Sequence, residues 1–217
     1  DMVPNLTALN TAVNDPIINN SYDFTTGETD QDNLYRQAFD NYVNQYHSVM
    51  VVGYTGNAPT GAYNVIAVAP YTGPIAPVTV TPGQRSLVDL VAPASAPSYA
   101  APQVSGVATL LYQAAQSNLG GAGTAASASD ERTLRALLLN GATKESDWTH
   151  TTTNPLDPRY GAGEVNALRS YENLVAGQHD AVIVTFPTAG DSSFSSPSAA
   201  PAIQLAGATG WDLATIS

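Results

Sequence analysis

The pattern of apolar and polar positions predicts helices that alternate with short buried strands. The clearest helix is 32–46, where apolar side chains recur at three- and four-residue intervals. Further helices are expected at 5–14, 101–116 and 131–139. Short apolar runs without polar alternation are typical of strands buried on both faces, and they lie at 17–18, 49–52, 65–68 and 88–91. Strands alternating with helices predict an α/β fold with a parallel sheet flanked by helices.

Segments rich in glycine, proline and polar residues separate these elements and show where the pattern changes. Residues 69–86 are expected to hold a surface hairpin, and 93–97 form a proline-rich turn. After Tyr171 the composition shifts, so we expect one domain over 1–175 and a second segment over 176–217. That segment is expected to contain a short strand, a linker and the start of a β-rich module, at 182–184, 187–201 and 204–217.

Charge and cysteine content narrow the classes of function. The net charge is −11 with only seven Lys and Arg, so the chain cannot neutralise a run of phosphates and nucleic acid is not an expected partner. The sequence has no cysteine, which removes disulfides, thiolate metal sites and cysteine nucleophiles. No apolar run approaches the roughly 18 to 20 residues that span a bilayer. The chain opens without a signal peptide and in the middle of a structural pattern, so it is expected to be part of a longer protein.

Ser98 is the residue that most suggests chemistry. It lies between the proline-rich turn and the predicted helix 101–116, whose first turn is expected to hold Pro102. A helix N-terminus offers unpaired N–H groups and a positive dipole end, which favour an oxyanion beside a reactive serine. Serine is also a leading helix-capping residue, and these local features alone favour the capping role.

A longer pattern favours the catalytic role. The segment from Ser98 to Gly106, SYAAPQVSG, followed by Val-Ala-Thr-Leu-Leu, resembles the nucleophile motif of the subtilisin-like serine peptidases. In that family the serine precedes a bulky residue, two small residues and a proline, and an apolar residue, a small residue and glycine follow. Further segments resemble the family in the same order, at 49–57, 62–68, 88–93 and 160–167. The resemblance covers about 5–172 and implies the C-terminal half of a three-layer subtilisin-like domain, with Ser98 as nucleophile.

The same resemblance assigns the residues around the nucleophile. Asn57 corresponds to the asparagine whose side-chain amide supplies one oxyanion-hole donor. Without the resemblance, Gly56-Asn57 is an ordinary turn dipeptide and the other residues are strand ends. The two walls of the implied substrate cleft are Ser21, Tyr22 and Asp23 on one side and Gly53, Tyr54, Thr55 and Gly56 on the other. An extended peptide would add to the sheet edge through backbone groups of the first wall.

The family triad is incomplete in this sequence. Subtilisin-like peptidases use Asp, His and Ser in chain order, and the Asp and His motifs have no counterpart before Ser98. Without a base, a serine hydroxyl is a poor nucleophile at neutral pH. His47 and His150 do not match the family base, and a triad of Ser98 with His179 and Asp180 would need one residue to orient its neighbour. We therefore predict that this chain alone is inactive.

The turn before the nucleophile also departs from the family. Ala96 and Pro97 stand where glycine and threonine are usual, and Gln103 stands where a histidine is common. The connection from Pro93 to Ser98 is shorter than in the family, and a cleft-wall glycine is replaced by Asp23.

Three functions are compatible with these residues. The first is a serine endopeptidase that works through an acyl-enzyme at Ser98 when its other half is present. The second is a non-catalytic relative that serves as a peptide-binding or structural domain of a secreted protein. The third is an interaction module of a cell-surface protein in which the segment 176–217 makes the functional contacts.

The expected partners are a peptide or protein substrate, the missing N-terminal half, and a second copy, because a sheet cut at its middle leaves an unpaired edge. The resemblance implies a secreted or cell-surface location.

No cofactor is expected from a motif. Related peptidases often bind calcium, and the acidic residues that could supply oxygen ligands are Asp30, Asp32, Asp147 and Asp157. They do not form a spaced acidic loop of the EF-hand kind, so solvated acids are the default interpretation.

Overall fold

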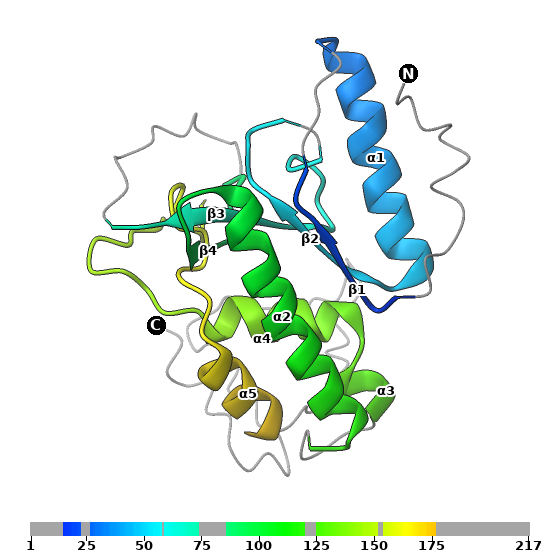
Figure 1. The fold of residues 1–217 in the computed structure, drawn as a ribbon, viewed down its shortest axis with the longest axis vertical. Coiled ribbons are helices and arrows are strands. Elements are labelled where there is room, and N and C mark those ends of the chain that lie inside the picture. The colour runs from blue at the N-terminus through cyan, green and yellow to red at the C-terminus, as the bar shows by residue number, and fades with distance from the viewer. Residues whose placement is uncertain are drawn as a thin grey trace, which may run out of the picture.

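A computed structural model describes residues 15–22, 27–57, 59–73, 86–119, 125–151 and 154–176. Four strands of this part form one parallel sheet in the order β1-β2-β3-β4 (Figure 1). The strands are β1 (Ile17–Asn20), β2 (Val49–Gly53), β3 (Ile66–Tyr71) and β4 (Leu90–Pro93). The helices are α1 (Thr29–Tyr46), α2 (Pro97–Gln116), α3 (Ala125–Ala128), α4 (Glu131–Gly141) and α5 (Ala167–Ala176). The predicted α/β class with a parallel sheet is confirmed.

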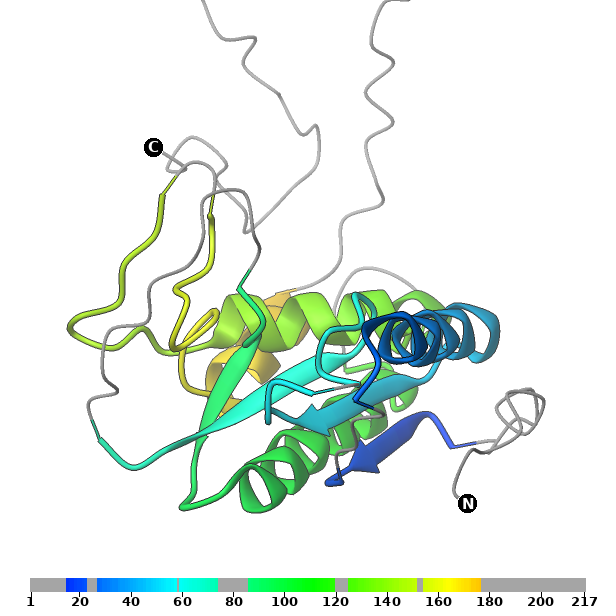
Figure 2. The ribbon, with the colours of Figure 1, turned by 90° about the horizontal axis from the view of Figure 1, so that it is seen from above.

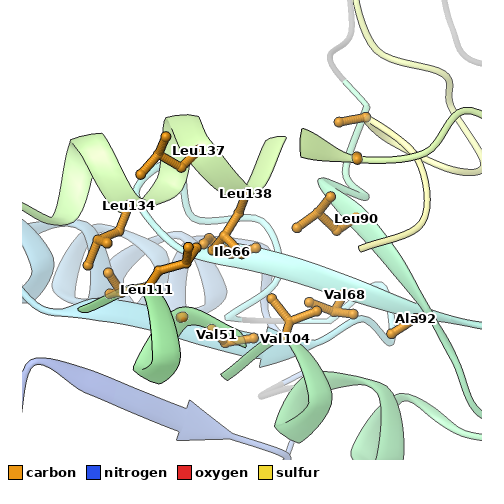
Figure 3. Close-up of a cluster of buried hydrophobic side chains, with 14 of the residues drawn as sticks. Val51, Ile66, Val68, Leu90, Ala92, Val104, Leu111, Leu134, Leu137 and Leu138 are labelled. Carbon is orange, nitrogen blue, oxygen red and sulfur yellow. The ribbon is translucent and has the colours of Figure 1, made fainter. Parts of the chain in front are cut away.

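Helices cover both faces of the sheet, which explains why its strands lack polar alternation. Figure 2 shows α1 on one side of the strands and α2 on the other. Val51 and Val68 face α2 and lie beside Val104 and Leu111 of that helix (Figure 3). The opposite face of β2 and β3 packs against α1 through a second buried group: Phe39, Tyr42, Val43, Met50, Val52 and Ala67. Every residue of β2 is buried, as expected for a central parallel strand.

α2 begins at Pro97, four residues before the predicted start. Ala96 is the N-cap and makes no side-chain capping bond, so Ser98 does not have the capping role that its local sequence alone favours. Pro97 occupies the first helical position, where its missing N–H costs little. Pro102 therefore lies in the second turn, not the first, and cannot donate the helix hydrogen bond that the Ser98 carbonyl would otherwise accept.

The C-terminal helices differ from the sequence expectation in two places. α4 matches the predicted helix, and Asp130 caps it by accepting a hydrogen bond from the Arg132 N–H at 3.0 Å. α5 was not predicted, because its apolar stripe is short and is interrupted by Ser170. The short α3 was also not predicted, since it lies within a stretch of small residues expected to be a loop.

Gly141 allows α4 and α5 to pack closely, because a Cβ on this glycine would lie 2.3 Å from the Ser170 Oγ.

Some predictions concern residues outside the described ranges: the helix 5–14, most of the hairpin 69–86 and the elements expected over 182–217. None of the described helices is long and apolar enough to cross a bilayer.

Candidate functional site

Ser98 lies where the first turn of α2 meets the carboxyl ends of β1 and β2. Its Oγ donates a hydrogen bond to the Ser21 carbonyl at 2.9 Å, although the two residues are 77 positions apart. Gly53, the last residue of β2, approaches the same turn, since a Cβ on Gly53 would lie 3.2 Å from Pro97. The carboxyl ends of parallel strands are the usual location of ligand sites in open α/β sheets. The structure thus brings Ser98, Ser21 and Gly53 together at that edge.

The N-terminus of α2 leaves a backbone donor at Ser98. The Tyr99 and Ala100 N–H groups both donate to the Ala96 carbonyl, at 3.0 and 3.1 Å. In the described part of the chain, no backbone oxygen accepts from the Ser98 N–H. A 20-residue helix also presents the positive end of its dipole here. An oxyanion beside Ser98 would therefore meet a free N–H and a favourable field.

Asn57 is held in a turn that follows β2. Its carbonyl accepts hydrogen bonds from the Thr60 N–H at 2.9 Å and from the Thr60 hydroxyl at 2.5 Å. Gly56 before it has a φ of +86°, a left-handed conformation that favours glycine. These contacts fix the backbone of Asn57 and leave its side chain partly exposed. Its role as an oxyanion donor stays a prediction.

The proposed cleft walls follow β1 and β2 directly. Ser21 and Tyr22 continue from β1, and the Tyr22 side chain is mostly exposed. The Tyr54 N–H donates to the Val68 carbonyl at 2.8 Å, so pairing with β3 continues past the end of β2. The Tyr54 side chain packs on the α1 side of the sheet, which leaves its backbone as the group nearest the proposed cleft. Thr55 is exposed, and Asp23 lies outside the described residues.

No described histidine is placed to act as a base for Ser98. His47 lies before the amino end of β2, and at about 3.3 Å per residue it is roughly 20 Å from Gly53 at the other end. Its Nδ1 lies 3.2 Å from a carboxylate oxygen of Glu131. The His150 ring packs against Trp148 at a tilt of 36°, with 4.9 Å between ring centres, in the segment between α4 and α5. His179 and Asp180 lie outside the described residues.

Gln103 has a role in the site that the sequence did not reveal. Its side-chain amide donates to the Pro93 carbonyl at 2.6 Å and to the Tyr99 carbonyl at 3.2 Å. These bonds join the end of β4 to the first turn of α2 and close the short connection between them. The only advance signal was the replacement of the usual histidine. Gln103 therefore holds the end of β4 against the first turn of α2, in which Ser98 lies.

A cluster of titratable groups lies at the carboxyl end of β3. The Tyr71 hydroxyl donates to Glu145 at 2.8 Å, and this hydrogen bond together with burial raises the pKa of Tyr71 to about 12. Burial also raises the pKa of Glu164, and the nearby charge of Glu145 adds to the effect.

The acids considered for calcium have other contacts. Asp147 and Asp157 both bind the Arg159 guanidinium, and Asp30 and Asp32 lie in the first turn of α1, where the helix dipole favours them. Within the described ranges no three His, Asp or Glu side chains gather in the manner of a metal site. The expectation that the chain binds no cofactor stays an untested prediction.

Comparison with solved structures finds the same fold in peptidase domains. The chain is similar to the self-cleaved protease domain of PatA, with a TM-score of 0.56 and 24% identity over 80% of this chain and 68% of that one. It is similar to the patellamide maturation protease PatA at a TM-score of 0.55 and 24% identity, again over 80% and 68%. The prenylagaramide maturation protease PagA gives 0.52 and 20%, over 78% and 66%.

These similarities show the fold alone. No family model matches the sequence, and no curated protein matches it. The predicted fold, a subtilisin-like α/β arrangement with a parallel sheet flanked by helices, is confirmed. Roughly a third of each neighbour's chain has no counterpart here.

Proposed function

We propose that this chain is the nucleophile-bearing part of a subtilisin-like serine endopeptidase domain. The observation that supports this most directly is the position of Ser98. It lies at the N-terminus of a long helix that packs on the sheet, beside the carboxyl ends of two parallel strands. It has a free N–H, and its hydroxyl reaches the Ser21 carbonyl at the end of β1. The sequence motif and the protease neighbours favour the same assignment.

In this proposal each site residue has a chemical role. The Ser98 Oγ attacks the carbonyl carbon of a peptide bond, and its proton passes to a base outside the described residues. The Ser98 N–H and the Asn57 amide stabilise the oxyanion, and the amine leaves to give a serine ester that water then hydrolyses. Ser21, Tyr22 and Gly53 to Gly56 would hold the peptide in an extended conformation between the two walls.

A non-catalytic peptide-binding domain is the second candidate, and one contact favours it. The Ser98 hydroxyl donates its hydrogen bond to the Ser21 backbone carbonyl, which cannot act as a base. Such a serine is oriented but not activated. The two functions share the same cleft and differ in whether a base reaches Ser98.

We expect a fluorophosphonate probe to leave Ser98 unlabelled in the isolated chain, because a serine without a base reacts slowly. Intact-mass spectrometry measures the labelling. Stoichiometric labelling that is lost in Ser98→Ala would contradict this prediction.

The same probe applied to the natural protein that contains this chain tests the proposed function. Labelling at Ser98, slowed by about 100-fold or more in Asn57→Ala, supports an endopeptidase, whereas no labelling supports the non-catalytic domain.

A face beside the site is suited to a further polypeptide. In the described sheet β1 pairs only with β2, so its other edge has no strand neighbour. A second exposed surface is the side of α2 that is turned away from the sheet, which we call the outer face; it includes Tyr99, Gly106 and Leu110 at helical spacing. Tyr99 and Leu110 are about two-thirds exposed, and a Cβ on Gly106 would meet no atom within 4 Å. Neither α2 nor β1 carries a charge, although the chain has a net charge of −11. We propose that another polypeptide unit covers this face, and that a second copy does so in the isolated chain.

We therefore expect the isolated chain to self-associate, and Leu110→Lys to shift it toward the monomer, because a lysine at the centre of an apolar contact is costly to bury. Sedimentation velocity measures the change. Leu168→Lys is the matched control, since Leu168 is equally exposed but lies on α5. A wild-type chain that is monomeric at every concentration, or an equal effect of both variants, would contradict the proposal.

A further inference from the structure

A series of hydrogen bonds connects the buried face of α2 to the end of β1, beside the proposed peptidase site. The Ser105 hydroxyl donates to the Asn19 Oδ1 at 3.1 Å, and the Asn19 Nδ2 donates to the Ser21 Oγ at 2.8 Å. The Ser21 carbonyl accepts a hydrogen bond from the Ser98 Oγ at 2.9 Å. The series therefore begins and ends on α2, and Asn19 is the link between Ser105 and Ser21.

Ser105 fixes the orientation of the Asn19 side-chain amide. Ser105 is only 8% exposed, and the other buried residues of α2 are all alanine, valine or leucine. Its hydroxyl also donates to the Ala101 carbonyl at 3.0 Å, one turn earlier in the helix, and that bond alone would satisfy a buried serine. The further contact with Asn19 holds the amide oxygen toward α2. The amide N–H groups are thereby directed toward Ser21.

The bond from Asn19 constrains a residue that lies just past the sheet. The pairing of β1 with β2 ends at Asn20, and in the described sheet the other side of β1 has no strand neighbour. Residues two positions apart in a strand lie on the same face, so Asn19 and Ser21 both face α2, as Ile17 does where it packs against the α2 side of the core. Because the side chain and the carbonyl of Ser21 share one Cα, holding the side chain also restricts the direction of the carbonyl.

We propose that Asn19 is a positioning residue that holds the Ser21 carbonyl where the Ser98 hydroxyl and an extended peptide both meet it. In its effect on activity this role rests on the proposed function, in which backbone groups of Ser21 bind the peptide. A carbonyl oxygen has two lone pairs, so the same atom can accept from Ser98 and from a peptide N–H. Asn19 touches neither the peptide nor the nucleophile and acts through Ser21.

Nuclear magnetic resonance of the full chain tests the positioning without any need for activity. The three-bond couplings between the α and β protons of Ser98 report its side-chain rotamer. We expect the couplings of one rotamer in the wild type and averaged couplings in Asn19→Leu, which keeps the size of the side chain but removes both hydrogen bonds. Ser21→Ala breaks the same link from its other end and should have the same effect. The double variant should add nothing further, because both changes remove one interaction.

Two further variants separate positioning from a general structural role. Asn19→Asp should restore the single Ser98 rotamer, since a carboxylate of the same shape accepts from the hydroxyls of both Ser105 and Ser21. Thr109→Val is the matched control and should leave the couplings unchanged. The Thr109 hydroxyl donates to the Ser105 carbonyl at 2.8 Å, a bond made within α2. Averaging in Thr109→Val equal to that in Asn19→Leu would show a loosened helix and would overturn the proposal.

Kinetics of the natural protein that contains this chain test the consequence for peptide cleavage. We expect Asn19→Leu and Ser21→Ala to lower kcat about five- to tenfold, the factor that corresponds to one typical net hydrogen bond, and Thr109→Val to leave it unchanged. Unchanged Ser98 couplings in both Asn19→Leu and Ser21→Ala would overturn the proposal, as would an unchanged kcat. A natural protein that cleaves no peptide would contradict the proposed function instead, and the rotamer measurement would still decide the role of Asn19.

Discussion

Replacing Asp157 with alanine is expected to lower the free energy of unfolding by about 3–4 kcal/mol. The Asp157 side chain is fully buried and lies 3.3 Å from the Arg159 guanidinium. One of its oxygens accepts hydrogen bonds from the backbone N–H groups of Arg159 at 2.7 Å and Tyr160 at 3.2 Å. The other accepts from the Thr149 N–H at 2.8 Å. Removing the carboxylate leaves these donors unpaired, and the buried Arg159 guanidinium keeps only the half-exposed Asp147 as its countercharge. Chemical denaturation measures the loss.

Asp147→Ala is the matched control for this prediction. Asp147 also binds Arg159, at 2.8 Å, but its side chain is half exposed. Its loss should cost less than about 1 kcal/mol, as for other solvent-exposed ion pairs. Equal losses in the two variants would contradict the assignment of Asp157 as the centre of the network.

The pH dependence of stability gives a second check on Asp157. Burial alone would raise the pKa of this carboxyl, but the hydrogen bond from the Arg159 side chain and those from backbone N–H groups outweigh it and lower the pKa. The ionised group therefore stabilises the fold above its unfolded pKa of about 3.9, and this contribution is lost as the pH falls through the folded pKa. Wild type should lose more stability than Asp157→Asn between about pH 4 and pH 2. Parallel pH curves would contradict this.

Gly161→Ala is expected to lower the free energy of unfolding by about 3 kcal/mol or more. Gly161 has a φ of +58°, where a side chain is strained. A Cβ there would also lie 2.3 Å from the Asp89 carbonyl oxygen and 2.6 Å from that of Val88. Both atoms belong to the backbone that leads into β4, so neither can rotate away. The free-energy cost of the positive φ and the cost of the forced backbone shift add together.

Gly56→Ala separates these two causes. Gly56 also has a positive φ, +86°, but a Cβ there would meet no atom within 4 Å. Only the conformational strain applies, so the expected loss is about 1 kcal/mol. Similar losses in the two variants would show that the close approach to Asp89 does not limit the packing.

The sequence predicted the sheet well because burial on both faces leaves a strong local pattern. β2 and β3 appear as apolar runs, and the apolar residues of α1 recur at three- and four-residue intervals over 32–46. The start of α2 was misplaced because Pro97 was assigned to the proline-rich turn and Pro102 to the first turn of the helix, whereas the helix begins at Pro97 and accommodates both prolines. α5 was missed because its stability depends on contact with α4 through Gly141, which is not a local property.

The candidate site was predictable in its composition but not in its hydrogen bonds. The motif located Ser98 near the end of β1, and the contact with Ser21 supports that placement. The direction of the Ser98 hydroxyl and the hydrogen bonds of Gln103 depend on residues that are distant along the chain or unusual for the family.

The strands lie side by side in the order in which a ribosome makes them, so the sheet can grow one strand at a time during synthesis. α2 contacts all four strands but is made after them. About 45 residues separate the end of β3 from the end of α2, which at about 5–20 residues per second takes several seconds. During that interval the valines and leucines that α2 later covers are open to water, and a nascent chain at this length should be a target for chaperones.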